Sequence, residues 1–111
     1  MNNLETYDSG ATRSVMNVRW DLLPANGIRQ LAEVMHLGAE VHGPRNWEKG
    51  LSAEVCINHC IDHIFAFQAG DQKENHLAHA GVNLLMALHS LDTWPELNKD
   101  GPAKYEGRKS E

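Results

Sequence analysis

The segment that decides the fold runs from His76 to Leu91 and reads HLAHAGVNLLMALHSL. Its apolar residues return every three or four positions, which is the spacing of one face of an α-helix. We therefore expect a helix over this segment. Its expected core stripe consists of Leu77, Ala80, Leu84, Leu88 and Leu91.

A second helical pattern precedes this segment. Residues 52–69 read SAEVCINHCIDHIFAFQA, with Ser52 as the start, Glu54 in the next turn and Gly70 as the end. Apolar residues cover much of the circumference of this pattern. We therefore expect it to be the central and most buried of the helices.

A third pattern lies nearer the N-terminus. It runs from Asn26, the expected cap, to about Val41, and Gly43 with Pro44 ends it. One face carries Ile28, Leu31, Ala32, Met35 and Ala39. No stretch of the chain shows the alternating pattern of a strand, so the sequence predicts an all-α bundle of three main helices.

The chain divides into three regions. Residues 1–18 are polar and are expected to form an arm that is loose or orders against a partner. Residues 19–91 form the helical domain, and residues 92–111 form a polar tail. Three helices of about 16 residues bury little surface alone, so we expect oligomerisation to complete the bundle, as a homodimer or homotetramer.

Composition excludes several classes of protein. The 111 residues include 15 acidic and 10 basic side chains, for a net charge of -5, which argues against a nucleic-acid partner. No apolar run is long enough for a membrane span or a signal core, so we expect a cytoplasmic protein with no membrane partner. The two cysteines, Cys56 and Cys60, are expected to be small buried hydrophobes.

Polar side chains form a strip on each expected helix. A polar cleft inside the bundle would result if the strips converge, as in the carboxylate metal sites of bundle proteins. Carboxylates favour Mg²⁺ or Mn²⁺, whereas three imidazoles favour Zn²⁺ or Ni²⁺. The alternative is that these groups are solvated or are hydrogen-bonded core histidines. The strips are Glu33, His36 and Glu40; His59, Asp62 and His63; and His76, His79 and Asn83.

Several short motifs carry a resemblance to a known family. They are RWDLLP at 19–24, AEV at 32–34 with GAE at 38–40, RNWEKG at 45–50, His63 with AF at 66–67, and HLAHA at 76–80 with Asn83. In this order, the stretch from Arg19 to Leu88 resembles a phage-borne branch of the all-α, MazG-like nucleotide pyrophosphohydrolases. This branch includes the MazZ-type dATP/dGTP diphosphohydrolases.

The resemblance implies hydrolysis of a purine deoxynucleoside triphosphate, dGTP or dATP, to the monophosphate and pyrophosphate. It implies a place in phage nucleotide metabolism linked to 2-aminoadenine DNA, in the cytoplasm of the infected host. The superfamily binds two or three Mg²⁺ or Mn²⁺ ions through E-x-x-E and E-x-x-D motifs. Here Glu33-x-x-His36 and His59-x-x-Asp62 stand at comparable spacings, with imidazoles in place of two carboxylates. His79-x-x-x-Asn83 is an alternative to the second pair.

The resemblance also suggests roles for individual residues. Glu33, His36, Glu40 and Asp62 are the expected metal ligands, while His63 and His79 are the expected catalytic residues that orient a phosphate or the water. The expected substrate-binding residues are Trp20, Arg45, Asn46, Trp47, Lys49 and Asn83. The alternative function is a non-enzymatic helical module that binds a metal or a partner through its histidines.

Overall fold

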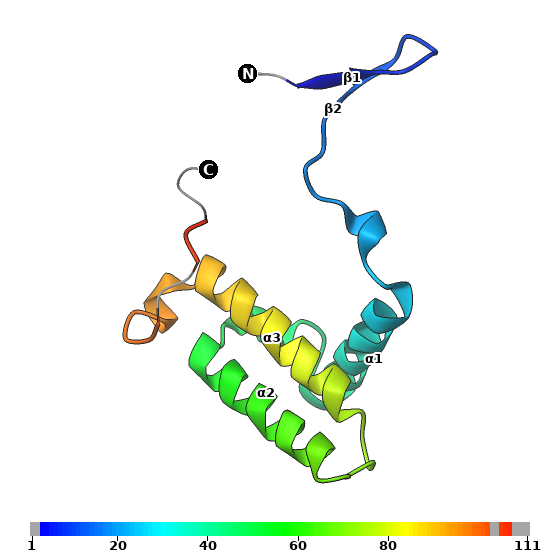
Figure 1. Ribbon diagram of the computed structural model, residues 1–111. Helices are drawn as coiled ribbons and strands as arrows, with labels where there is room; N and C mark the ends of the chain where they lie inside the picture. Colours follow the sequence, from blue (N-terminus) through cyan, green and yellow to red (C-terminus); the bar gives the residue numbers. More distant parts are fainter. Residues whose placement is uncertain (1–2, 103–104, 108–111) are drawn as a thin grey trace.

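The computed structural model describes residues 3–102 and 105–107 and confirms the expected all-α bundle (Figure 1). Its main helices are α1 (Ala25–His42), α2 (Ala53–Gln68) and α3 (His76–Thr93). Three short 3-10 turns are η1 (Trp20–Leu22), η2 (Asn46–Lys49) and η3 (Pro95–Leu97). No helix within the described residues is long and apolar enough to cross a membrane.

Helices α2 and α3 form an antiparallel hairpin whose ends are fixed by side-chain caps. The side chain of Ser52 accepts a hydrogen bond from the Val55 amide at 3.3 Å, as its position before α2 predicts. The side chain of Asn75 accepts one from the Ala78 amide at 3.2 Å and so starts α3. Small buried residues, among them Cys56, fill the space between the two helices.

The central helix is α3, not α2, so the expectation for residues 52–69 is wrong. Figure 1 shows α3 between α2 and α1, and α3 packs against both. Val34 of α1 joins Ala78 and Val82 of α3 in one buried cluster. A Cβ added at Gly81 would lie 2.7 Å from Cδ2 of Leu31, so the missing side chain lets α1 approach closely.

The expected core stripe of α3 is confirmed at Ala80, which is buried, but is wrong for the single chain at three of its leucines. Leu77, Leu84 and Leu88 are 52%, 47% and 69% exposed. The physical reason is that α3 contacts two other helices closely, and close contact selects small side chains. The buried residues of α3 are accordingly His76, Ala78, Ala80, Val82, Ala87 and Ser90.

Helix α1 differs from expectation at its start and on its face. It begins at Ala25 after Pro24, so Asn26 lies inside the first turn and is not the cap. Pro24 is in an extended conformation and its carbonyl accepts a hydrogen bond from the Ile28 amide at 3.0 Å. Val34 is the buried residue of α1, while Ile28 and Ala32 of the expected face are exposed.

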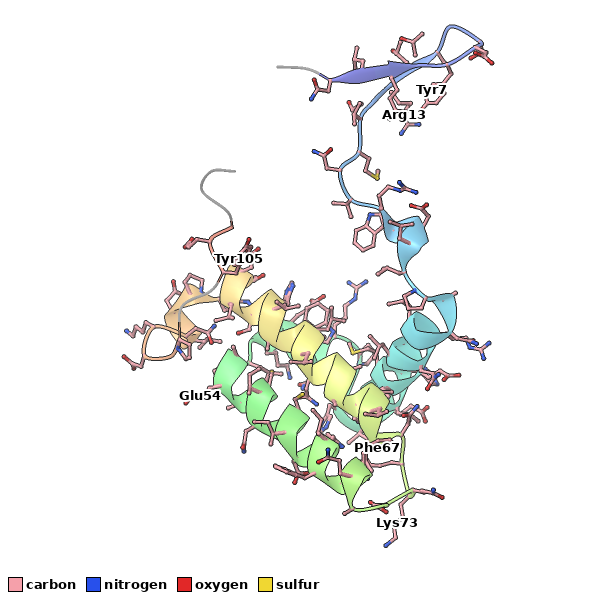
Figure 2. All side chains as sticks on the ribbon, viewed as in Figure 1. Tyr7, Arg13, Glu54, Phe67, Lys73 and Tyr105 are labelled. Carbon is pink, nitrogen blue, oxygen red and sulfur yellow. The ribbon has the colours of Figure 1, made fainter. Side chains whose placement is uncertain are left out.

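The N-terminal arm contains a β-hairpin that the sequence did not predict. Strands β1 (Leu4–Thr6) and β2 (Thr12–Ser14) pair in antiparallel register, with Leu4 opposite Ser14. Both strands are exposed on both faces, which explains why no apolar alternation marks them. The hairpin stands apart from the helices, and its side chains, among them Tyr7 and Arg13, are exposed (Figures 1 and 2).

The beginning of the expected tail is tied to the helices through Asn98. Its Oδ1 accepts a hydrogen bond from the Ala53 amide at 2.8 Å. Its Nδ2 donates to the carbonyl oxygens of Trp94 and Ser90, at 2.9 and 3.2 Å. Other parts of this tail, residues 103–104 and 108–111, lie outside the described residues.

Candidate functional site

Three imidazoles and two carboxylates meet where α2 ends and α3 begins. His63 stands near the end of α2, His76 is the first residue of α3 and His79 follows one turn later, while Asp71 and Glu74 lie in the connecting loop. The Nδ1 atoms of His63 and His76 are 2.9 Å apart. The rings of His63 and His79 stack with centroids 4.7 Å apart.

The partner of His76 determines which of its ring nitrogens is free to bind a cation. Nε2 of His76 lies 2.7 Å from Oδ2 of Asp71. In a neutral ring Nε2–H therefore donates to Asp71, and Nδ1 carries the lone pair, directed toward His63. A carboxylate that holds the far nitrogen of an imidazole is the usual support of a metal-binding histidine.

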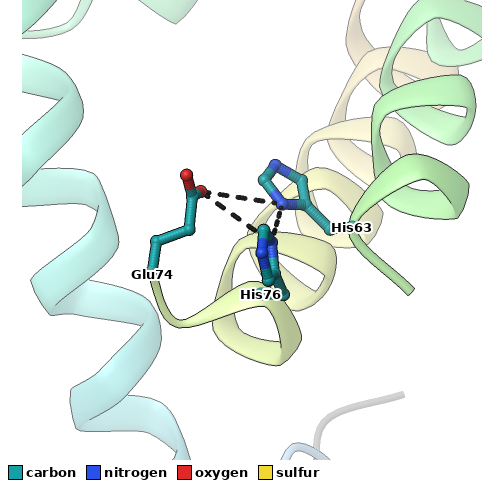
Figure 3. A group of neighbouring side chains, drawn as sticks. All are labelled: His63, Glu74 and His76. Atoms are coloured by element: carbon teal, nitrogen blue, oxygen red, sulfur yellow. Dashed lines mark hydrogen bonds and ion pairs between the residues drawn. The ribbon is translucent and has the colours of Figure 1, made fainter. Parts of the chain in front are cut away.

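Glu74 brings an oxygen ligand to the same point. Its Oε1 lies 3.8 Å from Nδ1 of His63 and 4.0 Å from Nδ1 of His76 (Figure 3). Within the described residues, one ligand atom from each of these three side chains lies within 4.8 Å of the others. The same oxygen is 3.5 Å from Nε2 of His79. Two imidazoles and a carboxylate therefore fit a divalent cation, with His79 beside it.

The electrostatics of this cluster favour the forms that bind metal. Burial lowers the pKa of His63, and the neighbouring imidazole of His79 lowers it further, although Glu74 opposes the shift. The hydrogen bond with His76 and a second one from the Lys73 amide lower the pKa of Asp71. The His63 imidazole is therefore neutral and the Asp71 carboxylate ionised at neutral pH, as metal binding requires.

A cleft of about 630 Å³, which we call the polar cleft because most of its lining residues are polar or charged, lies beside this cluster, between α1 and the start of α3. It contains cationic, anionic and imidazole side chains, a mixture suited to a charged ligand with bound cations. Its charged and titratable lining residues are Arg29, Glu33, His36, Lys73, Glu74 and His79.

An apolar cleft of about 360 Å³ adjoins the polar cleft. His79, Val34 and Leu37 line both, so the two are neighbours. The apolar cleft is walled mainly by aliphatic side chains and Trp47. The polar groups that reach it include Arg45, Asn46, His79 and Asn83.

Trp47 is held in the wall of the apolar cleft by two further rings. Its ring meets His89 edge-on, with centroids 5.2 Å apart and planes at 88°. His89 in turn meets Trp94 edge-on at 5.1 Å. The turn that presents Trp47 starts at Arg45, which has the left-handed φ of 60°. The three rings therefore fix one side of the cleft to the C-terminal half of α3.

The structure brings together most of the residues that the sequence singled out. His63 and His79 lie in the imidazole cluster. Glu33 and His36 line the polar cleft with His79. Arg45, Asn46, Trp47 and Asn83 line the apolar cleft, where the amide of Asn83 donates to the His79 carbonyl at 2.9 Å.

Four of the singled-out residues lie elsewhere. Glu40 forms an ion pair with His36 at 3.0 Å, and both side chains are mostly exposed. Asp62 and Lys49 are exposed, and neither is among the residues that line the two clefts. Trp20 is 70% exposed in η1, on the segment that leads from the arm to α1.

Sequence reasoning missed Asp71 and Glu74 and did not place His76 among the site residues. Asp71 and Glu74 were part of a short polar loop with no helical period, so no face could be assigned to them. A usable signal was present, because the loop joins two antiparallel helices that carry His63 and His76 at their adjoining ends. Any loop that closes such a hairpin brings its own side chains beside those ends.

Comparison with known proteins identifies one family. The family model described as "dATP/dGTP diphosphohydrolase, N-terminal" matches residues 7–100. This range contains the imidazole cluster and both clefts. No curated protein and no solved structure matches the chain.

Proposed function

Because this chain belongs to the dATP/dGTP diphosphohydrolase family, we propose that it hydrolyses dGTP and dATP to the monophosphate and pyrophosphate in the two adjoining clefts, with divalent cations. Family membership makes the chain a nucleoside triphosphate diphosphohydrolase, so the non-enzymatic module is no longer the alternative. The observation that carries the proposed site is the position of His79. It lines both clefts and lies beside the cluster of His63, Glu74 and His76.

The polar cleft is the proposed site of the triphosphate. His63, His76 and Glu74 would hold one cation, and Glu33 and His36, across the cleft, would hold a second. When bound, such ions neutralise phosphate charge and lower the pKa of a bound water. The mixed set of imidazole and carboxylate ligands favours Mn²⁺ over Mg²⁺, since Mg²⁺ prefers oxygen ligands and retains its waters.

Arg29 and Lys73 supply positive charge to the proposed triphosphate site. They line the polar cleft, where they would pair with the oxygens of the outer phosphates. His79 would orient the attacking water or the α-phosphate, since it is the polar residue that reaches both clefts. The chain thereby provides what phosphoryl transfer requires, which is charge neutralisation and a positioned nucleophile without a covalent intermediate.

The apolar cleft is the proposed site of the purine. Trp47 offers an aromatic surface for stacking, and its contact with His89 holds that surface in place. Asn46 and Asn83 would hydrogen-bond the edge of the base or the sugar, and Arg45 lines the same cleft. An apolar cleft with a few polar groups is the common form of a small-molecule site.

Roles for Glu40, Asp62, Trp20 and Lys49 remain proposals that rest on the resemblance. None of the four lines either cleft. Glu40 could act through its ion pair with His36, whereas the other three would require closure around the substrate or a second copy of the chain. Comparing Glu33→Ala with Asp62→Ala tests this. A loss of turnover in both variants would keep Asp62 as a ligand, whereas a loss confined to Glu33→Ala would remove it.

The proposed context is phage nucleotide metabolism linked to 2-aminoadenine DNA, in the cytoplasm of the host. Hydrolysis of dATP would remove the ordinary adenine precursor. Hydrolysis of dGTP would yield a purine monophosphate that already carries the 2-amino group of 2-aminoadenine. Expression of the chain in a bacterial host should therefore lower the dATP and dGTP pools and raise dGMP, as measured in nucleotide extracts.

A product assay tests the proposed reaction. The chain is incubated with each of the four deoxynucleoside triphosphates, with Mn²⁺, with Mg²⁺ or with a chelator. We expect monophosphate and pyrophosphate in equal amounts from dGTP and dATP, and none with the chelator. In water labelled with heavy oxygen, the label should enter the monophosphate if the α-phosphorus is attacked. Orthophosphate or tripolyphosphate as the sole inorganic product would exclude the reaction.

A further inference from the structure

We propose that Ser90 and Asn98 are positioning residues for the purine. They fasten the end of the loop of residues 43–52, which joins α1 to α2 and carries Trp47, to α3. We call Ser90, Asn98 and the turn η3 between them the brace. The inference rests on the proposed purine site and deepens it, because it names the residues that set the wall of that site.

The loop of residues 43–52 takes its place relative to α3 from contacts outside itself. Helices α1 and α2 both pack on α3 rather than mainly on each other. The loop keeps its own shape through local backbone hydrogen bonds and through the left-handed φ angles of Arg45 and Gly50, at 60° and 105°. Trp47 and Leu51 line the apolar cleft, so any shift of the loop changes the shape of that cleft.

Ser90 connects the loop directly to α3. Its side chain is fully buried, and Oγ donates a hydrogen bond to the carbonyl oxygen of Leu51. The same Oγ accepts a hydrogen bond from Nδ2 of Asn98 at 2.9 Å. Both functions of the hydroxyl are thus engaged, and loss of either partner would leave a buried polar group unpaired. Leu51 is therefore held at one position against α3.

Asn98 and η3 hold the same end of the loop from the other side. Oδ1 of Asn98 accepts a hydrogen bond from the Ala53 amide at 2.8 Å, and Nδ2 donates to the Trp94 carbonyl at 2.9 Å. The turn also packs closely on Gly50, where an added Cβ would lie 2.9 Å from Cδ1 of Leu97. The brace therefore contacts the chain at residues 50, 51 and 53, directly after the turn that carries Trp47.

Helix α3 relates the brace to the rest of the proposed site. Successive residues of an α-helix are about 100° apart, so His79, Asn83 and Ser90 lie within about 40° of one another on a single strip. His79 lines both clefts, and Asn83 lines the apolar cleft. Ser90 stands three turns beyond His79, about 16 Å along the helix. One rigid helix therefore sets the separation between the phosphate end of the site and the wall that carries Trp47.

Loosening the brace should change how the site binds the base and leave its phosphate end unchanged. Asn98→Ala should raise KM for dGTP about 5- to 30-fold, the usual range for losing a partly buried hydrogen bond. Hydrolysis of deoxyribose 5′-triphosphate, which lacks the base, should proceed as in the wild type. Mn²⁺ affinity should also be unchanged, because the brace lies at the opposite end of α3 from His76. A role in folding alone would lower activity on both triphosphates equally.

The experiment compares Asn98→Ala with Lys99→Ala in the full chain. Lys99 is the adjacent residue and is exposed, so Lys99→Ala is the matched control and should behave as the wild type. Kinetics on the two triphosphates are combined with calorimetric titration with dGMP, which carries the base and needs no turnover. Affinity for dGMP should fall in Asn98→Ala by a factor similar to the rise in KM. If circular dichroism shows that Asn98→Ala loses its helices, Leu97→Ala, which shortens a half-exposed side chain, replaces it.

The comparison separates the brace from the proposed reaction. Weaker dGMP binding with unchanged hydrolysis of the base-free triphosphate supports the brace. Equal dGMP affinity in the variant and in Lys99→Ala overturns it, as does an equal loss of activity on both triphosphates or a wild type that does not bind dGMP. A wild type that binds dGMP but hydrolyses no triphosphate would refute the proposed function, and the dGMP titration alone would then decide the role of the brace.

Discussion

Two sides of the α2–α3 hairpin reverse what hydropathy suggests for each: the histidine face, with His63 and His76, and the aliphatic face, with Leu84 and Leu88. The side chains of His63 and His76 are only 16% and 7% exposed on the histidine face. Leu88, on the aliphatic face, is 69% exposed. The imidazoles are buried because they contact one another and pair with Asp71 and Glu74. The leucines are only partly covered by the residues that the structure describes. Burial in one chain therefore follows the local partners of a side chain more closely than its polarity.

The largest expected effect is on the histidine face. His76→Ala removes the imidazole that links His63 to Asp71, so we expect loss of tight divalent-cation binding and a fall in dGTP hydrolysis of at least about 100-fold. Calorimetric titration with Mn²⁺ and a pyrophosphate assay measure the two quantities. Glu74→Gln, which changes a half-exposed side chain, should act in the same direction without unfolding the protein. Unchanged Mn²⁺ binding in both variants would show that the ion binds elsewhere.

A smaller effect is expected from the residue that supports His76. Asp71→Asn keeps the shape of the side chain but removes its charge, so the tautomer of His76 is less firmly fixed. We expect Mn²⁺ affinity to fall about 10- to 100-fold, which is the usual cost of losing such a partner. Gln72→Ala, in the same loop, is the control and should bind normally. A wild-type affinity in Asp71→Asn would mean that the contact with His76 only stabilises the loop.

The ring contacts of Trp47 give a milder effect that separates binding from turnover. His89→Ala removes the ring between Trp47 and Trp94, and we expect KM for dGTP to rise about 2- to 10-fold, since an aromatic contact is worth about 0.5–1.5 kcal/mol. The value of kcat should change less than KM, because His89 touches neither the polar cleft nor the imidazole cluster. Steady-state kinetics check this, with His89→Phe as the variant that should restore KM. A fall in kcat with unchanged KM would contradict this role.

The smallest effect is a pH dependence of stability in the metal-free chain. The pKa of His63 in the folded chain lies below its ordinary value of about 6.5, mainly because the ring is buried. As the pH falls below about 6.5, the unfolded chain takes up a proton that folded His63 does not, so the free energy of unfolding decreases. Thermal melts in a chelator should show this decrease, and it should be weaker in His63→Gln. Equal slopes in both proteins would contradict the role of His63.

Much of the fold was predictable from local signals. Ser52 and Gly70 bracket a helical pattern, and the three helices follow from apolar spacing and from Gly43 with Pro44. The position of α3 at the centre was not predictable in this way. It depends on small residues such as Ala78, Ala80 and Gly81, which let the neighbouring helices approach. Such residues contribute little to an apolar periodicity that leucines dominate.

The candidate site was predictable where it lies on helices and not where it lies in loops. His63 and His79 were found because helical spacing assigns them to a face. Asp71 and Glu74 belong to the turn of the hairpin, and their approach to His76 depends on how the turn closes, which no period encodes. Asp62 lies between His59 and His63 in the sequence, which suggests a metal ligand, but α2 places its side chain on the exposed side.

Asn98 sets a lower limit on the length of any shortened version of this protein. The side-chain amide of Asn98 accepts a hydrogen bond from the backbone of Ala53 at the start of α2. It also donates hydrogen bonds to the carbonyl oxygens of Ser90 and Trp94 at the end of α3. Cutting the chain after Thr93 would leave those backbone groups to find water in a partly buried corner, at about 1–3 kcal/mol for each unpaired group. A minimal fragment for crystallography or library screening should therefore retain the sequence through at least residue 98.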